Sequence, residues 1–217
     1  MKNSFLKNKR ILITAGPTWV PIDDVRVISN ISSGELGVLL AEEARAHGSQ
    51  VDLFLGPVGR VCSREHFRIT RFRYFNEFLD LVQRELKKRK YDIILHGAAV
   101  SDYLVKRFEG KISSKRYDLS LKLSRAPKII DIIRRLNPEA FLVMFKLEVG
   151  VTDSVLLKRA LEAMKRSGAD LAVANTFDDG KYKGFIVGSN QLLAKTRSKP
   201  QLASALLKIL KEKVEVR

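Results

Sequence analysis

The residues with the clearest chemical potential lie between the first expected strand and the first expected helix. This segment, residues 16–37, reads GPTWVPIDDVRVISNISSGELG and follows a strand ending near Ala15. Loops between a strand and a helix usually span about 2–6 residues, and much longer ones are commonly functional. Backbone amides at a helix N-terminus attract phosphate. We therefore expect an anion-binding site here, with a merely well-capped helix as the alternative.

The glycines and serines of this segment indicate how such a site would be built. Ser32 and Glu35 have the spacing of a capping box, so Ser32 is expected to cap a helix that starts near Ser33. Gly34 and Gly37 leave room for other groups to approach that helix end. The pattern is not G-x-G-x-x-G directly after a strand and contains no G-K-[ST], which disfavours an ordinary dinucleotide fold and excludes a P-loop.

Two further segments carry groups that could act on a substrate. Residues 96–103 read HGAAVSDY, in which small alanines leave room for a flat ring and Asp102 lies at the mouth of the sheet or caps a turn. His96 is more typical of a core histidine than of a catalyst. Lys111 lies in a polar segment and could close over phosphates, although a solvated lysine is the commoner case. The pair Asp23–Asp24 could bind a metal, but carboxylates in such turns more often accept local backbone hydrogen bonds.

The composition is strongly basic, with 40 Lys and Arg against 24 Asp and Glu and a net charge of +16 among 217 residues. The charges are spread along the chain, so a solvated surface, attraction of small polyanionic substrates and nucleic-acid binding all remain open. Lys or Arg interrupts every apolar run before the roughly 20 residues that span a bilayer, so no membrane association is expected. Cys62 is the only cysteine, which excludes intrachain disulfides and cysteine-based zinc sites. A cytoplasmic location is expected.

Strand-like and helix-like segments alternate along the chain, which predicts an α/β fold with a mainly parallel sheet covered by helices on both faces. Residues 1–217 are expected to form one domain, with ligands at the carboxyl ends of the strands. The exception is an excursion over about residues 101–126, interpreted as a β-ribbon that serves as a flap and a dimer contact. The expected strands are 10–15, 51–55, 68–72, 93–95, 141–145, 171–174 and an edge strand 192–195; the expected helices are 33–47, 76–89, 127–136, 153–167 and one capped by Ser198.

Taken together, these segments resemble the phosphopantothenate–cysteine ligases (phosphopantothenoylcysteine synthetases) of coenzyme A biosynthesis. The match covers nearly the whole chain in the order and spacing of the family. The motifs that carry it are ITAGPT (13–18), PID (21–23), VRVISN (25–30), SSG (32–34), AAVSDY (98–103), KI (111–112), PKII (127–130), FKLE (145–148) and AN (174–175).

The resemblance implies a Rossmann-like three-layer αβα fold, a homodimer and a two-step ligation. The carboxylate of 4′-phosphopantothenate attacks the α-phosphate of CTP or ATP, which gives an acyl-nucleotidylate and pyrophosphate. The amine of L-cysteine then displaces the nucleoside monophosphate. Mg²⁺ would neutralise the triphosphate without dedicated protein ligands. The form implied is stand-alone, with the flavin decarboxylase of fused relatives on another polypeptide.

The resemblance also implies roles for individual residues. Asn30, Arg26 and Lys111 correspond to catalytic positions, with Asn30 holding the acyl intermediate and Lys111 closing on the triphosphate. Lys128 reverses a charge common in the fused bacterial enzymes, and Lys165 or Arg166 could replace two lysines of the CTP-using branch. The alternatives are a dinucleotide-dependent oxidoreductase and a basic nucleic-acid-binding α/β protein. The implied nucleotide-binding positions are Gly16, Ser32, Ser33, Gly34, Gly37, Ala98, Ala99, Asp102, Lys111, Pro127, Lys128, Ile129, Ile130 and Phe145.

Overall fold

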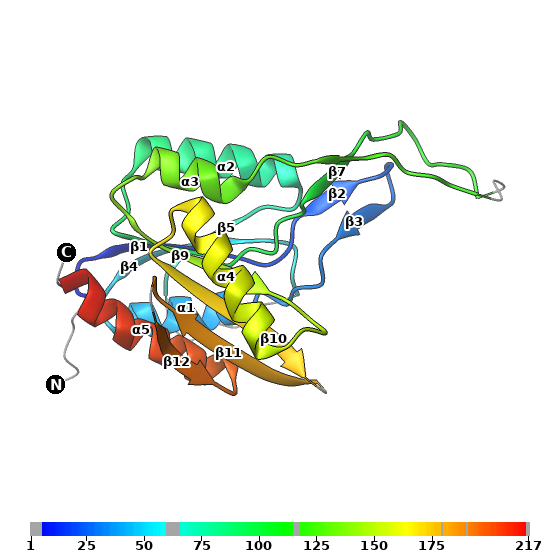
Figure 1. Cartoon of the computed structure of the whole chain (residues 1–217). Helices are drawn as coiled ribbons and strands as arrows, with labels where there is room; N and C mark the ends of the chain where they lie inside the picture. Colours follow the sequence, from blue (N-terminus) through cyan, green and yellow to red (C-terminus); the bar gives the residue numbers. More distant parts are fainter. Residues whose placement is uncertain (1–5, 60–65, 115–117, 179, 190, 216–217) are drawn as a thin grey trace.

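An eight-stranded sheet forms the middle layer of the protein (Figure 1). The computed structural model describes residues 6–59, 66–114, 118–178, 180–189 and 191–215, so Cys62 lies outside the described residues. The strands run in the order β12-β11-β10-β9-β6-β1-β4-β5 across the sheet. Their bounds are β1 (Arg10–Ala15), β4 (Gln50–Leu55), β5 (Arg68–Arg71), β6 (Ile93–His96), β9 (Phe141–Leu147), β10 (Leu171–Asp178), β11 (Lys181–Val187) and β12 (Leu192–Thr196).

Helices cover both faces of this sheet, which confirms the expected three-layer Rossmann-like α/β fold. The described helices are α1 (Glu35–Ala46), α2 (Phe75–Lys88), α3 (Ile129–Leu136), α4 (Asp153–Ser167) and α5 (Lys199–Glu215). α1 and α5 pack together under one face, and α2, α3 and α4 lie on the other (Figure 1). No helix in the described residues is long and apolar enough to cross a membrane.

The sheet is mainly parallel, as expected. β1 pairs in parallel with β4 on one side and with β6 on the other, and Ile11 to Ala15 of β1 are all buried. Near-continuous burial of this kind is typical of strands covered on both faces. Only β11 runs against the common direction among the described strands of this sheet, because it pairs antiparallel both with β10 and with the edge strand β12. β11 was not among the expected strands, since its first residues, Lys-Tyr-Lys-Gly, do not form an apolar run.

An arm projects from the sheet. We define it as residues 19–29 with the described part of residues 103–125 (Figure 1). It contains two antiparallel pairs, β2 (Trp19–Pro21) with β3 (Val27–Ser29) and β7 (Tyr103–Val105) with β8 (Leu123–Arg125). The β-ribbon expected over residues 101–126 is therefore confirmed only at its base, because Leu119 and Leu121 lie outside any strand. The β2–β3 pair was not expected.

The close packing of α1 on β1 generates a stability prediction. A Cβ at Gly37 would lie 2.2 Å from the Cβ of Ala15, so Gly37→Ala must push the helix away from the strand. Such overpacking costs about 1–3 kcal/mol, and we expect the melting temperature to fall by about 2–4 °C per kcal/mol in a chain of this size. Gly59→Ala is the control, since nothing lies within 4 Å of its Cβ position. Equal melting temperatures for the two variants by circular dichroism would contradict this packing.

Candidate functional site

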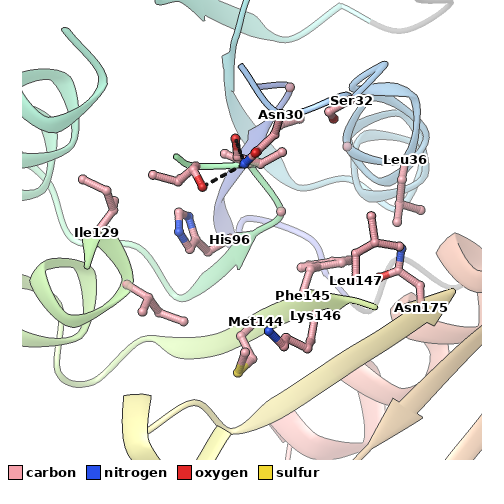
Figure 2. A pocket seen from close by; sticks show the side chains of 18 of the residues that line it. Asn30, Ser32, Leu36, His96, Ile129, Met144, Phe145, Lys146, Leu147 and Asn175 are labelled. Atoms are coloured by element: carbon pink, nitrogen blue, oxygen red, sulfur yellow. Dashed lines mark hydrogen bonds between the residues drawn. The ribbon is translucent and has the colours of Figure 1, made fainter. Parts of the chain in front are cut away.

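A cavity of about 920 Å³ opens at the carboxyl ends of the central strands (Figure 2). The chain proceeds from β1 to β4 on one side of β1 and returns to β6 on the other side, so the strand order reverses between β1 and β6. Open α/β sheets bind ligands at such a switch point. The cavity is lined by residues from β1 and the segment leading to α1, from the segments after β6 and β8, and from β9, α4, β10 and α5.

The segment leading into α1 forms one wall of the cavity. The helix begins at Glu35, and its N-cap is Gly34 in the left-handed region with φ of 70°. The expectation that Ser32 caps the helix is therefore wrong: its hydroxyl accepts only a 3.4 Å bond from the amide of Gly34, while the hydroxyl of Ser33 accepts one of 3.4 Å from Glu35. Glycine adopts the left-handed conformation without steric cost, which explains Gly34 at the N-cap. With Gly34 in this conformation, the hydroxyls of Ser32 and Ser33 accept only from the amides of Gly34 and Glu35 and do not cap the first turn.

Hydrogen bonds join this wall to the loop after β6. The side-chain amide of Asn30 donates to the carbonyl oxygens of Ala99 and Val100 at 3.3 and 3.1 Å (Figure 2). Beneath it, the backbone amide of Ala99 donates to Gly16 at 2.9 Å. The amide nitrogen of Asn30 is thus used on the backbone, so its carbonyl oxygen is the atom that it can offer to a ligand.

His96 lies at the floor of the cavity and is buried. Its Nδ1 is 2.8 Å from the hydroxyl of Thr14, and its ring stacks on Phe78 with centroids 6.2 Å apart. Burial lowers the pKa of His96 to about 4, so the imidazole is neutral near pH 7. These contacts confirm the expected core histidine, which in addition presents part of its surface to the cavity.

Ion pairs surround the cavity opening. Lys128 is 2.5 Å from Asp102, and both side chains are exposed. Lys199, the first residue of α5, is 2.5 Å from Glu35 at the start of α1. Lys199 was not among the expected site residues, because no local signal connects residues that are 164 positions apart. These lysines could exchange their carboxylate partners for the phosphates of a ligand.

Most of the residues expected to contact nucleotide line this cavity. Asn30 lines it too, whereas Arg26 and Lys111 do not. Further lining residues had no expected nucleotide contact, although Lys146 and Asn175 lie in the motifs FKLE and AN. The expected residues that line the cavity are Gly16, Ser32, Ser33, Gly34, Gly37, Ala98, Ala99, Asp102, Pro127, Lys128, Ile129, Ile130 and Phe145; the unexpected ones include Met144, Lys146, Asn175, Phe177, Tyr182 and Lys199.

Arg26 and Lys111 lie together on the arm instead. The guanidinium of Arg26 donates to the carbonyl oxygen of Ile112 at 3.2 Å and to the carboxylate of Asp23 at 2.6 Å. Asp23 also accepts local backbone hydrogen bonds, which confirms the local-backbone interpretation for Asp23, whereas the carboxylate of Asp24 pairs with Arg107. Within the described ranges, no group of three or more His, Cys, Asp and Glu side chains could hold a metal ion.

Comparisons with known proteins agree with this geometry. The chain matches the family "DNA/pantothenate metabolism flavoprotein C-terminal domain" over residues 6–214. The coenzyme A biosynthesis bifunctional protein CoaBC of Thermococcus kodakarensis is 42% identical over 172 residues, covering 79% of this chain and 42% of that protein. The CoaBC protein of Methanocaldococcus jannaschii is 31% identical over 216 residues, covering 96% of this chain and 52% of that protein.

A solved structure agrees over nearly the full length. The crystal structure of the DNA/pantothenate metabolism flavoprotein from Streptococcus pneumoniae superimposes with a TM-score of 0.84 at 28% identity, covering 94% of this chain and 99% of that one. The chain spans about half the length of the curated relatives that it matches. On the extent of these matches, the chain belongs to the family of the DNA/pantothenate metabolism flavoprotein C-terminal domain.

Proposed function

We propose that this chain is a phosphopantothenate–cysteine ligase. It joins 4′-phosphopantothenate to L-cysteine through an acyl-nucleotidylate formed from a nucleoside triphosphate. The observation that carries the proposal is the meeting of residues 30–37 with residues 98–102 around one cavity at the switch point of the sheet. Relatives named as coenzyme A biosynthesis proteins support it. The oxidoreductase alternative is disfavoured because the segment after β1 lacks the G-x-G-x-x-G pattern, and the nucleic-acid alternative does not account for this cavity.

The cavity can supply the two things that this chemistry requires, which are positioning and stabilisation of charge. The first amides of α1 and the adjacent serine hydroxyls are suited to phosphate oxygens. Phe145 and the small residues Ala98 and Ala99 leave space for a base against the β6 loop. The side-chain oxygen of Asn30 would hold the acyl intermediate by accepting a hydrogen bond from an N–H or O–H group of its pantothenate portion.

The nucleotide is proposed to be CTP or ATP, with CTP slightly favoured. Arg166 lines the cavity, whereas Lys165 lies in a separate shallow groove on the outer side of α4. Of the two candidates for the missing lysines, we therefore propose Arg166 as the residue that contacts the nucleotide. The described residues offer no carboxylate cluster for Mg²⁺, so we propose that the ion enters bound to the triphosphate.

We also propose that the chain acts as a homodimer assembled through the arm. The arm exposes large apolar side chains, among them Val25 (64%) and Tyr103 (51%), that a second copy would cover. Arg26 and Lys111 do not line the cavity of their own chain, so a second copy could also receive them. Sedimentation equilibrium is expected to give twice the mass of the chain, and the mass of a single chain would contradict this arrangement.

The central test is a turnover assay. Purified protein with phosphopantothenate, L-cysteine, Mg²⁺ and either CTP or ATP is expected to release pyrophosphate, and omission of phosphopantothenate should abolish the release. No pyrophosphate with any triphosphate would remove the ligase proposal. Salt-sensitive retention of DNA without turnover would favour the nucleic-acid alternative.

Asn30→Asp separates the two half-reactions. The carboxylate would face the carbonyl oxygens of Ala99 and Val100 without a proton to donate. We expect the activated intermediate still to form but its capture by cysteine to slow by about 10²-fold, since the acyl group is misaligned. Quenched-flow detection should show a burst of pyrophosphate followed by slow release of nucleoside monophosphate. Equal rates for both products at the wild-type level would contradict the role of Asn30.

Lys111→Gln tests the nucleotidyl transfer. Loss of a cation that approaches the triphosphate should depress pyrophosphate release by about 10²-fold, while cysteine capture of preformed intermediate stays near normal. Lys106→Gln is the matched control on the same arm, because its side chain is exposed as well. A Lys111→Gln variant as active as the Lys106→Gln control would remove Lys111 from the catalytic set.

A further inference from the structure

Asp23 is a buried carboxylate in a place where buried charge is unusual. It lies on the arm, outside the three apolar clusters of the core, yet its side chain is fully buried. Burial of a carboxylate is unfavourable unless hydrogen bonds satisfy its oxygens. Such a group therefore indicates that the surrounding chain is arranged around it.

The carboxylate of Asp23 joins the turn between β2 and β3 to the segment that contains Ile112. Oδ1 accepts from the backbone amides of Val25 and Arg26 at 2.9 and 2.7 Å, which closes the turn between β2 and β3. Oδ2 accepts from the guanidinium of Arg26 at 2.6 Å and from the backbone amide of Ile112 at 3.0 Å. Burial opposes ionisation, but the bonds from Val25, Ile112 and Arg26 and the charge of Arg26 outweigh it and lower the pKa of Asp23 to about 2. The carboxylate is therefore charged throughout the physiological range.

Other contacts extend this connection along the arm. The amide of Phe108 donates to the carbonyl oxygen of Ile22 at 2.8 Å, and the amide of Asp24 donates to Gly110 at 3.2 Å. Arg107 pairs with Asp24 at 2.6 Å, but both of these side chains are more than half exposed. Exposed ion pairs contribute little to stability. Asp23 is thus the buried charged contact between the turn and the segment that carries Lys111.

We propose that Asp23 is a positioning residue that holds Arg26 and Lys111 in one geometry. The inference rests on the proposed ligase function, because it gives a role to the arrangement of two residues proposed to be catalytic. Arg26 is a direct partner of the carboxylate, and Lys111 immediately precedes Ile112, the other partner of Oδ2. Asp23 itself does not line the cavity. It acts through Arg26 and Lys111, so loss of the Asp23 carboxylate should slow the same step of the reaction as loss of Arg26 and Lys111.

Asp23→Asn is the selective test. The variant keeps the size of the side chain and one oxygen that can accept from the amides of the local turn. Its NH₂ group replaces the oxygen that accepted from Arg26 and Ile112, and an NH₂ group cannot accept their hydrogen bonds. Asp24→Asn is the matched control, because it removes the same charge one residue away and leaves the bonds of Asp23 intact. Hydrogen exchange is expected to show the Ile112 amide about tenfold less protected in Asp23→Asn and within about twofold of wild type in Asp24→Asn.

Turnover supplies the second readout. Asp23→Asn should lower kcat for pyrophosphate release by about 10-fold to 10²-fold with a smaller change in KM, and Asp24→Asn should turn over like wild type. In an Arg26→Gln, Lys111→Gln background, Asp23→Asn should add less than about twofold, since residues that act as a unit are not additive. A further tenfold loss in that background would overturn the positioning role, as would normal turnover of Asp23→Asn in a wild-type background.

The outcomes also separate this inference from the proposed function. If the wild-type chain releases no pyrophosphate, the ligase proposal fails and the positioning role fails with it. If wild type is active and the Ile112 amide keeps its protection in Asp23→Asn, the positioning role alone fails. Should Asp23→Asn not fold by circular dichroism, Ile112→Pro removes the same hydrogen bond from the other segment, and the same loss of kcat is expected.

Discussion

The hydrogen bonding between the segment after β1 and the loop after β6 is the constraint on which the site depends. Residues 19–29 of the segment before α1 project from the sheet on the arm, so bonds at Gly16 and Asn30 hold the two ends of this segment beside the sheet. The amide of Asn30 on two carbonyl oxygens, and the amide of Ala99 on Gly16, bring the two segments to the same end of adjacent parallel strands. Each segment then presents small residues and free polar atoms to one shared cavity.

The packing of α1 and the chemistry of the cavity are linked by the same glycines. Gly37 lets the helix lie close to Ala15, and the left-handed Gly34 directs the chain into the first turn without a side-chain cap. A helix that begins uncapped at a cavity keeps its first amides available to a ligand. The stability of this region and its capacity to bind an anion therefore follow from one local arrangement.

Most helices and strands could be predicted from the sequence, but backbone conformation at single residues and some distant contacts could not. The bounds expected for α4 agree with those observed, because Thr152 caps its start and Gly168 ends it. The cap at Ser32 was wrong, since the capping-box spacing says nothing about the left-handed conformation of Gly34. Gly16, Asn30 and the residues after β6 line one cavity because parallel strands bring their carboxyl ends together, whereas Arg26 of the same segment lies on the arm. Lys199 could not be found, because its position depends on how α5 packs beside α1.

The proposed catalytic residues divide into two groups in space. Asn30 belongs to the cavity, whereas Arg26 and Lys111 belong to the arm, where the buried carboxylate of Asp23 connects their segments. The central claim is that the cavity at the start of α1 receives the anionic groups of the substrates. A crystal structure with a non-hydrolysable triphosphate tests it most directly. The account predicts phosphate density beside the first amides of α1 and the residues after β6. Triphosphate bound elsewhere, with this cavity empty, would contradict it.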